Sequence, residues 1–283
     1  MRRIFAFTAL VLWLSAVNAI TPHISVRDKG KQTKTTLPVH PWAGHRIGFI
    51  GDSVTDPNLY GNDVKKYWQY LAEWLGIKPC VQAVSGHQWS HAPALIDRLY
   101  QAEGDSMDAI FVFLGTNEFN AAVPLGQWFD EKKEKVMRAV GEEKHLQERM
   151  HRTLSSDPNT LRGRINIALQ KLKSLYPTRQ IVLLTPLHRG FAEFGSRNVQ
   201  PDENYQNELG LYVDAYVQAI KEASNVWSVP VIDLNAVSGL NPMVEEQRCY
   251  FWSTEHDCLH PNSLGHERIA RVLMAEMWRL PLF

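Results

Sequence analysis

The amino-acid sequence predicts an α/β fold in which a mainly parallel β-sheet lies between layers of helices. Short apolar segments alternate with longer amphipathic segments from His45 onward. The apolar segments are nearly continuous, as expected for strands that are covered on both faces. Steady alternation of strands and helices is typical of chains that build a parallel sheet.

Each element follows from a local change in this pattern. The segment HRIGFIG is a short apolar run, and the next segment has helical periodicity and ends at Gly76, a residue type that often follows a helix. The most strongly apolar run is DAIFVFLGTNE, which ends in turn residues. In chain order we predict a strand at 45–51, a helix at 63–76, a strand at 80–86, a helix at 92–103, a strand at 108–118, a helix at 162–177, a strand at 180–186, a helix at 205–225, a strand at 229–234 and a helix at 262–280.

The alternation is interrupted between about residues 119 and 160. Within this stretch, residues 129–152 are rich in helix-forming residues and carry many charges of both signs. Such charge runs are usually solvated. We therefore predict a charged helical insertion at about 119–160 in a single domain that spans 45–283.

The N-terminus has the pattern of a secretory signal peptide. Two arginines precede an apolar run at residues 4–17, and small side chains at Val17 and Ala19 suit a cleavage site. The run is shorter than the roughly 20 residues that span a bilayer, so we expect no stable membrane anchor. We predict a signal peptide at 1–19, an extended polar arm at 20–44, and a secreted or periplasmic protein.

The composition gives no electrostatic reason to expect a nucleic-acid partner. The 283 residues include 30 basic and 30 acidic side chains, so no large positive surface is expected. Export would permit a disulfide between Cys249 and Cys258, with Cys80 left over, and three free thiols are the alternative. The cysteine spacing does not match a zinc site.

Four polar motifs stand at strand ends or just before the last helix. They are Gly51-Asp52-Ser53, Ser85-Gly86-His87, Gly115-Thr116-Asn117-Glu118 and Asp257-Cys258-Leu259-His260-Pro261. Each alone is ordinary turn chemistry. Ligands of open α/β sheets bind beyond the carboxyl ends of the strands, so the conjunction of all four predicts a functional site there.

The order of these motifs resembles that of the SGNH hydrolases, the GDSL-type lipases and esterases. The resemblance covers nearly the whole chain from about His45. It implies a three-layer α/β/α sandwich of flavodoxin-like type with a central, mainly parallel sheet of about five strands, and it implies ester hydrolysis without a cofactor. By position it makes Ser53 the nucleophile, His260 the general base and Asp257 the group that orients this histidine. The implied oxyanion-hole donors are the backbone N–H groups of Ser53 and Gly86 and the amide of Asn117.

The residue types suit these roles chemically. A serine hydroxyl needs an adjacent base to act as a nucleophile, and a carboxylate holds the imidazole in the required tautomer. A glycine leaves its backbone N–H open to approach. The third motif departs from the family pattern because Glu118 stands where an aspartate is usual, and Val54 replaces a leucine in the first. We expect Asp52 to hold the turn rather than to react.

The substrate is less well defined by the sequence. His188, Arg189, Trp89 and Trp252 are candidate substrate-binding residues, with Trp128 as a weaker one. The remaining histidines lack the spacing of metal ligands, so we expect no metal site. The charged insertion is unlike an apolar lipase lid, and we expect a small-molecule or polysaccharide ester, most simply a carbohydrate O-acetyl ester. A lysophospholipase or lipase-like acylhydrolase, a sugar O-acetyltransferase and an inactive carbohydrate-binding descendant of the fold stay open, as does the oligomeric state.

Overall fold

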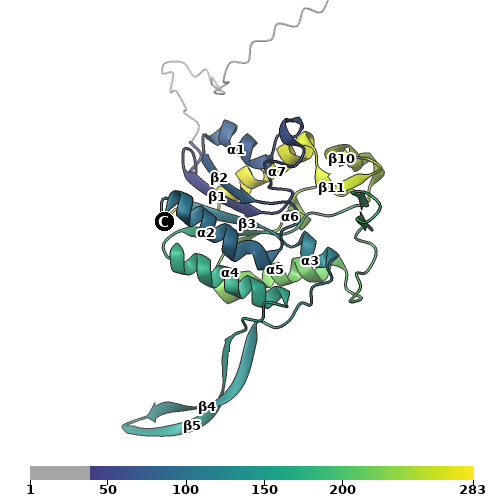
Figure 1. Ribbon diagram of the computed structural model, residues 1–283. Coiled ribbons are helices and arrows are strands. Elements are labelled where there is room, and N and C mark those ends of the chain that lie inside the picture. Colours follow the sequence, from purple (N-terminus) through teal and green to yellow (C-terminus); the bar gives the residue numbers. More distant parts are fainter. Residues whose placement is uncertain (1–38) are drawn as a thin grey trace, which may run out of the picture. The chain divides into compact units, whose positions relative to one another are not determined.

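The computed structural model describes residues 39–283, of which His40–Phe283 form one compact unit (Figure 1). The signal peptide predicted at 1–19 and most of the arm predicted at 20–44 lie outside the described residues. The last five residues of the predicted arm belong instead to the compact unit. Trp42 is fully buried, and its indole N–H donates to the Met277 carbonyl at 3.0 Å. Burial of this large aromatic side chain moves the start of the domain from His45 to His40.

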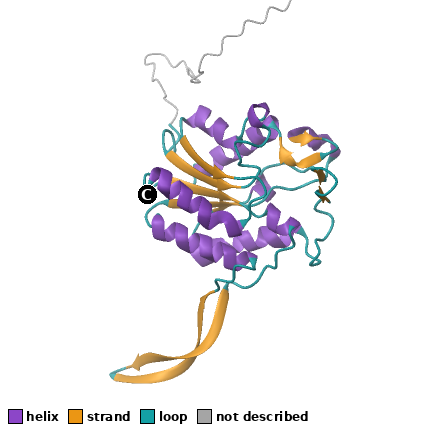
Figure 2. Cartoon of the chain, viewed as in Figure 1, coloured by secondary structure: helices purple, strands orange, loops and turns teal. Residues whose placement is uncertain are grey.

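The central sheet has five strands, all parallel, in the order β2-β1-β3-β6-β9 (Figure 2). Its strands are β1 (Arg46–Gly51), β2 (Lys78–Ala83), β3 (Ala109–Phe113), β6 (Gln180–Leu184) and β9 (Val231–Ile232). The predicted sheet is thereby confirmed.

Helices cover both faces of this sheet and complete three layers (Figure 1). One layer holds α1 (Tyr67–Leu75) and α7 (Ser263–Met277), and the other holds α2 (Ala92–Glu103), α4 (Leu161–Leu175) and α5 (Val213–Trp227). Successive side chains of a strand point to opposite faces, so in β3 Phe111 packs in the first layer and Ile110 and Val112 pack in the second. This explains why the strand is apolar at every position. The short helices are α3 (Thr116–Asn120), α6 (Leu234–Val237), η1 (Gly61–Asp63), η2 (Trp89–His91) and η3 (Glu245–Tyr250).

A second, antiparallel sheet was not anticipated from the sequence. It consists of β10 (Phe251–Ser253), β11 (Asp257–Pro261), β7 (Ala192–Glu193) and β8 (Val199–Gln200), in that order. None of these strands exceeds five residues, which is too short for a periodic pattern to be read from the sequence. Strand β11 carries the Asp257-x-x-His260 motif.

The prediction of a helical insertion was wrong. Residues 129–154 form a β-hairpin of β4 (Phe129–Val140) and β5 (Glu143–Leu154), which extends away from the helical layers (Figure 1). Opposite charges lie across the strands, with Glu134 facing Arg149 and Lys135 facing Glu148, and such pairs favour the ladder. The two-residue turn contains Gly141 at φ 63°, a conformation that ends any helix and suits a hairpin. Helix propensity is a weak prior that these features override.

Helix α5 begins eight residues later than predicted. The Asn207 side chain accepts hydrogen bonds from the backbone N–H groups of Leu209 and Leu211 and donates to the Phe119 carbonyl. Because an asparagine side chain competes with helical backbone bonds, residues 205–212 form a loop that is fixed to α3.

Candidate active site

The polar motifs predicted at strand ends meet at one edge of the central sheet. Gly51, the last residue of β1, pairs with Ala83 of β2 on one side and with Phe113 of β3 on the other. The strand order reverses at this point, because β2 lies on one side of β1 while β3, β6 and β9 lie on the other. This is where an open α/β sheet binds its ligand.

A pocket of about 440 Å³ lies at this edge and has a size typical of small-molecule sites. Residues from all four sequence motifs line it, namely Ser53, Ser85, Gly86, Asn117, Leu259 and His260. The other lining residues are the amides Gln88, Asn120, Asn198 and Gln200 and the apolar Leu59, Ala121 and Phe194.

Ser53, His260 and Asp257 form a continuous hydrogen-bonded series. The Nε2 atom of His260 lies 2.9 Å from Ser53 Oγ, and Nδ1 lies 2.9 Å from Asp257 Oδ2. All three residues are buried. The other oxygen, Oδ1, accepts the backbone N–H groups of Leu259 and His260. Burial disfavours the ionised form of Asp257, but its hydrogen bonds with His260 and Tyr60 hold the pKa of this carboxyl below its usual value.

The turn that carries Ser53 requires glycine at its start. A Cβ atom on Gly51 would lie 2.4 Å from Thr55 Oγ1. Any residue other than glycine would therefore force the turn to move. The Asp52 side chain accepts the Val54 N–H at 3.1 Å, and the backbone carbonyl of Asp52 accepts the N–H groups of Thr55 and Asp56. These bonds fix the backbone on either side of the serine.

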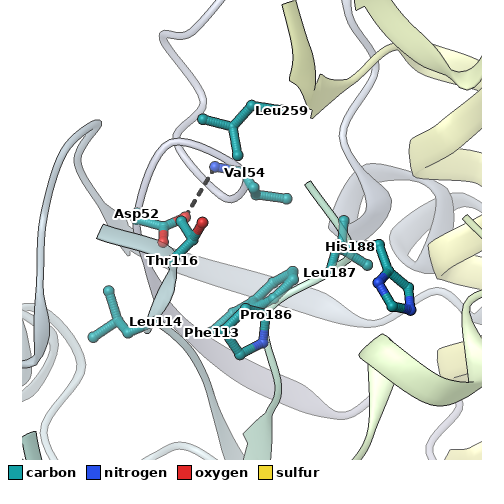
Figure 3. A pocket seen from close by; sticks show the side chains of 9 residues that line it. All are labelled: Asp52, Val54, Phe113, Leu114, Thr116, Pro186, Leu187, His188 and Leu259. Atoms are coloured by element: carbon teal, nitrogen blue, oxygen red, sulfur yellow. Dashed lines mark hydrogen bonds between the residues drawn. The ribbon is translucent and has the colours of Figure 1, made fainter. Parts of the chain in front are cut away.

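The Asp52 carboxyl borders a separate cavity of about 10 Å³ beneath the turn (Figure 3). This space is about that of one water molecule, so it is too small for a substrate. Burial raises the pKa of Asp52 to about 7. Asp52 does not line the Ser53 pocket, in keeping with the expectation that it holds the turn.

Three residues that line the pocket carry hydrogen-bond donors without a full set of partners. Among residues 39–283, no group accepts the backbone N–H of Ser53 or of Gly86. Gly86 has φ 79°, which glycine adopts without strain. One N–H of the Asn117 amide donates to the His87 carbonyl at 2.9 Å, and since an amide has two N–H groups the other remains available. The arrangement can stabilise a developing oxyanion.

Glu118 connects two of the loops that build the site. It is fully buried and accepts the backbone N–H of Trp89, and Arg164 Nη1 lies 3.9 Å from its carboxylate. Burial raises the pKa of Glu118 to about 8. The residue that departs from the family pattern therefore links α3, which follows β3, to η2, which follows β2.

Tyr60 is a site residue that the sequence did not suggest. Its hydroxyl donates to Asp257 Oδ2, and its ring stacks on Trp252 with centroids 4.0 Å apart. Its backbone is left-handed, with φ 58°, a rare conformation for a residue of this size that is often found at functional sites. No local signal links a tyrosine in the first loop to a carboxylate 197 positions later.

The predicted substrate-binding residues do not line the Ser53 pocket. Trp89 and Arg189 are buried, so the structure does not support direct substrate contacts by either. Arg189 instead donates to Thr116 and Gln200. His188 pairs with Glu203, which raises its pKa and holds it beside the small cavity. Trp252 supports Tyr60, and Trp128 bonds Glu222 beside the core. Five of the thirteen residues that do line the pocket are asparagines or glutamines, which are common in loops and carry no distinctive signal in the sequence.

The disulfide considered from the sequence is not formed in the structure. Cys80, Cys249 and Cys258 are free thiols, and Cys258 Sγ donates to the Ser253 carbonyl at 3.3 Å. Over residues 39–283, no group of three or more histidine, cysteine or acidic side chains is arranged to hold a metal ion. In the same part of the chain, no helix has the length and apolarity to cross a membrane.

Comparison with known proteins agrees with this geometry. No curated protein matches the sequence. Among solved structures, a protein from Lactobacillus plantarum has 25% identity and a TM-score of 0.63 over 83% of this chain and 97% of its own. A possible lipase from Chitinophaga pinensis has 21% identity and a TM-score of 0.58 over 82% and 97%. A catalytic mutant of an acetylxylan esterase from Geobacillus stearothermophilus has 17% identity and a TM-score of 0.50 over 83% and 96%. The model of the GDSL-like lipase/acylhydrolase family matches residues 49–268, and the chain therefore belongs to this family of carboxylic ester hydrolases.

Proposed function

We propose that this chain is an exported serine esterase that removes acetyl groups from carbohydrate. The observation that carries the proposal is the hydrogen-bonded series from Ser53 through His260 to Asp257, of which Ser53 and His260 line the pocket. Export is supported by the signal-peptide pattern at residues 1–19.

The first step acylates the enzyme. Ser53 Oγ attacks the carbonyl carbon of the ester while His260 Nε2 takes the hydroxyl proton. Asp257 stabilises the imidazolium that forms. The negative oxygen of the tetrahedral intermediate accepts hydrogen bonds from the N–H groups of Ser53 and Gly86 and from the Asn117 amide. The carbon–oxygen bond to the alcohol then breaks, and His260 returns the proton to the leaving oxygen.

The second step regenerates the enzyme with water. His260 Nε2 takes a proton from a water molecule as its oxygen attacks the carbonyl carbon of the acyl-enzyme. The same donors stabilise the second tetrahedral intermediate. The bond to Ser53 Oγ breaks, and the serine recovers its proton from His260 while the carboxylic acid leaves.

A small acyl group on a sugar suits the lining of the pocket. Five amide side chains line it, and neutral amides both donate and accept hydrogen bonds, as sugar hydroxyls require. Leu59, Ala121, Phe194 and Leu259 supply apolar side chains of the lining, against which the methyl group of an acetyl ester can pack. No residue of the hairpin at 129–154 lines the pocket. The acetylxylan esterase among the structural neighbours has the same fold.

Hydrolysis of a nitrophenyl ester series from acetate to palmitate tests the proposal. The mature protein is compared with Ser53→Ala and with Ser106→Ala, a control in an exposed serine shortly after α2. We expect activity to fall with chain length, to be lost in Ser53→Ala and to persist in the control. Maximal activity on long acyl chains would indicate a lipid substrate and contradict the carbohydrate substrate. Full activity of Ser53→Ala would overturn the mechanism.

A further inference from the structure

A second pocket adjoins the one that contains Ser53. It has a volume of about 330 Å³ and shares two lining residues, Asn120 and Asn198, with the Ser53 pocket. Its far side is formed by the loop that precedes α5, including Tyr205. The two pockets therefore adjoin each other at these asparagines, and the pair is called the groove below.

The asparagine at the junction is held by a chain of hydrogen bonds from the protein interior. Buried Arg189 donates through Nη2 to Gln200 Oε1 at 2.6 Å, and Gln200 Nε2 donates to Asn198 Oδ1 at 2.9 Å. With its oxygen engaged in this way, Asn198 has its NH₂ group available to a ligand. A polar group that is oriented before binding loses less entropy on binding.

The far wall of the second pocket is also fixed. Asn207 donates to the Phe119 carbonyl at 3.1 Å and to the Tyr216 hydroxyl at 2.9 Å. These bonds hold the loop against α3 and α5. Tyr205 stands on this loop with 64% of its surface exposed, and an exposed aromatic ring beside a polar groove presents a flat apolar face to a ligand.

The charges around the second pocket are of mixed sign. Arg197 lies with Asp202 and Glu208 among the lining residues. This combination gives no net attraction for a polyanion. An uncharged ligand with an apolar face and several hydroxyl groups matches an aromatic ring flanked by amides.

We infer that the second pocket is a distal subsite for a further sugar ring of the same acetylated chain. This inference rests on the proposed function. The ring that carries the acetyl group occupies the pocket at Ser53, and its neighbour stacks on Tyr205. Asn198 and Asn120 contact the substrate at the junction. The substrate class is therefore an uncharged, acetylated oligo- or polysaccharide rather than a free acetylated monosaccharide.

The test compares kcat/KM for an acetylated xylotetraose with kcat/KM for nitrophenyl acetate. Tyr205→Ala should lower the ratio of the two by about tenfold. Tyr205→Phe keeps the aromatic ring, so in this variant the ratio should stay close to that of the wild type. Tyr212→Ala, in an exposed tyrosine that lines neither pocket, is the matched control. An unchanged ratio in Tyr205→Ala would overturn the inference, and so would an equal loss in the control.

A binding measurement distinguishes failure of the proposed function from failure of the distal subsite. Calorimetric titration of Ser53→Ala with the acetylated tetrasaccharide reports on the groove without hydrolysis. Binding that is weakened about tenfold by adding Tyr205→Ala supports the distal subsite even if the wild-type protein hydrolyses no ester. Binding of equal strength with and without Tyr205→Ala would overturn the subsite even if nitrophenyl acetate is hydrolysed.

Discussion

The hydroxyl of Tyr60 donates a hydrogen bond to Asp257 Oδ2, the oxygen that also lies 2.9 Å from His260 Nδ1. Burial, together with this bond, raises the pKa of Tyr60, so the phenol remains a donor throughout the working pH range of an esterase. The same hydroxyl lies 3.5 Å from His260 Nδ1. Tyr60 therefore acts on Ser53 through Asp257 and His260, as a positioning residue. It orients the carboxylate and keeps it ionised.

Replacing Tyr60 by phenylalanine should change the pH profile as well as the rate. Loss of the donor removes one of the interactions that lower the pKa of Asp257, so the acid limb of kcat/KM should move to higher pH. A hydrogen bond to a charged group is typically worth about 1.5–3 kcal/mol, and we expect kcat to fall about tenfold with little change in KM. Rates measured from pH 4 to 9 give both quantities.

The stacking of Tyr60 on Trp252 supplies the control for that variant. Phe keeps the ring, so Tyr60→Phe should preserve the stack, whereas Trp252→Ala removes it and leaves the hydroxyl. An unchanged kcat and acid limb in Tyr60→Phe, with a lower kcat in Trp252→Ala, would mean that Tyr60 contributes only packing.

Removal of the Asn117 amide should slow chemistry more than it weakens binding. Asn117→Ala deletes a donor that we assign to the oxyanion, and loss of one such donor typically costs about 100- to 1000-fold in kcat. KM for nitrophenyl acetate should change little. The side chain also donates to the His87 carbonyl, so thermal unfolding of the variant must show that the loop after β2 is intact. A loss confined to KM would contradict the assignment.

Local patterns were sufficient to predict the central sheet and the positions of Ser53, Gly86 and Asn117. Each follows a strand of this sheet, and parallel strands bring their carboxyl ends to one edge whatever the order of the strands. The sequence could therefore place these side chains together without knowledge of long-range contacts.

Features that depend on tertiary contacts could not be predicted in this way. The bond from Tyr60 to Asp257 joins two segments that carry no common pattern. The hairpin at 129–154 has a helix-forming composition, and its cross-strand charge pairs appear only once the register is known. Arg189 looked like a ligand-binding cation because it follows a strand, yet it is buried and acts through Gln200.

Buried Glu118 should make the fold less stable as the pH rises. Its pKa is raised from an ordinary value near 4.5 to about 8, so between these values the folded state retains a proton that the unfolded state has lost. Stability then falls with rising pH, by up to about 1.4 kcal/mol per pH unit for this group. Glu118→Gln, which still accepts the Trp89 N–H, should flatten the decline between pH 4.5 and 8.

Denaturant unfolding at several pH values measures this slope. The pKa of Asp52 is raised to about 7, so this residue also lowers the stability as the pH rises, up to about pH 7 instead of pH 8. This contribution persists in Glu118→Gln. Glu255→Gln, in an exposed carboxylate, should leave the slope unchanged. Equal slopes for the wild type and Glu118→Gln would show that Glu118 is ionised in the folded protein, with Arg164 as its counterion.

Excision of the hairpin should leave both the fold and the active site intact. Phe129 pairs with Leu154 at its base, so residues 130–153 can be replaced by a two-residue Asn-Gly turn. Most side chains beyond the base are exposed, and a two-stranded hairpin in water adds little stability of its own. We expect Tm to change by a few degrees at most and kcat/KM for nitrophenyl acetate to stay within about twofold.

The contacts at the base of the hairpin should contribute more to the stability of the protein than the hairpin itself. Asn166 donates to the carbonyls of Trp128 and Ser155, which flank the hairpin, and accepts the Trp227 indole N–H. Asn166→Ala leaves the buried Ser155 carbonyl and the Trp227 indole N–H without this partner, whereas the Trp128 carbonyl still accepts the Ser155 N–H. The loss should destabilise the protein by about 1–3 kcal/mol, more than removal of the whole hairpin. The hairpin supplies no residue to the Ser53 pocket. A tenfold loss of esterase activity on excision would therefore mean that in solution it folds over the pocket as a lid.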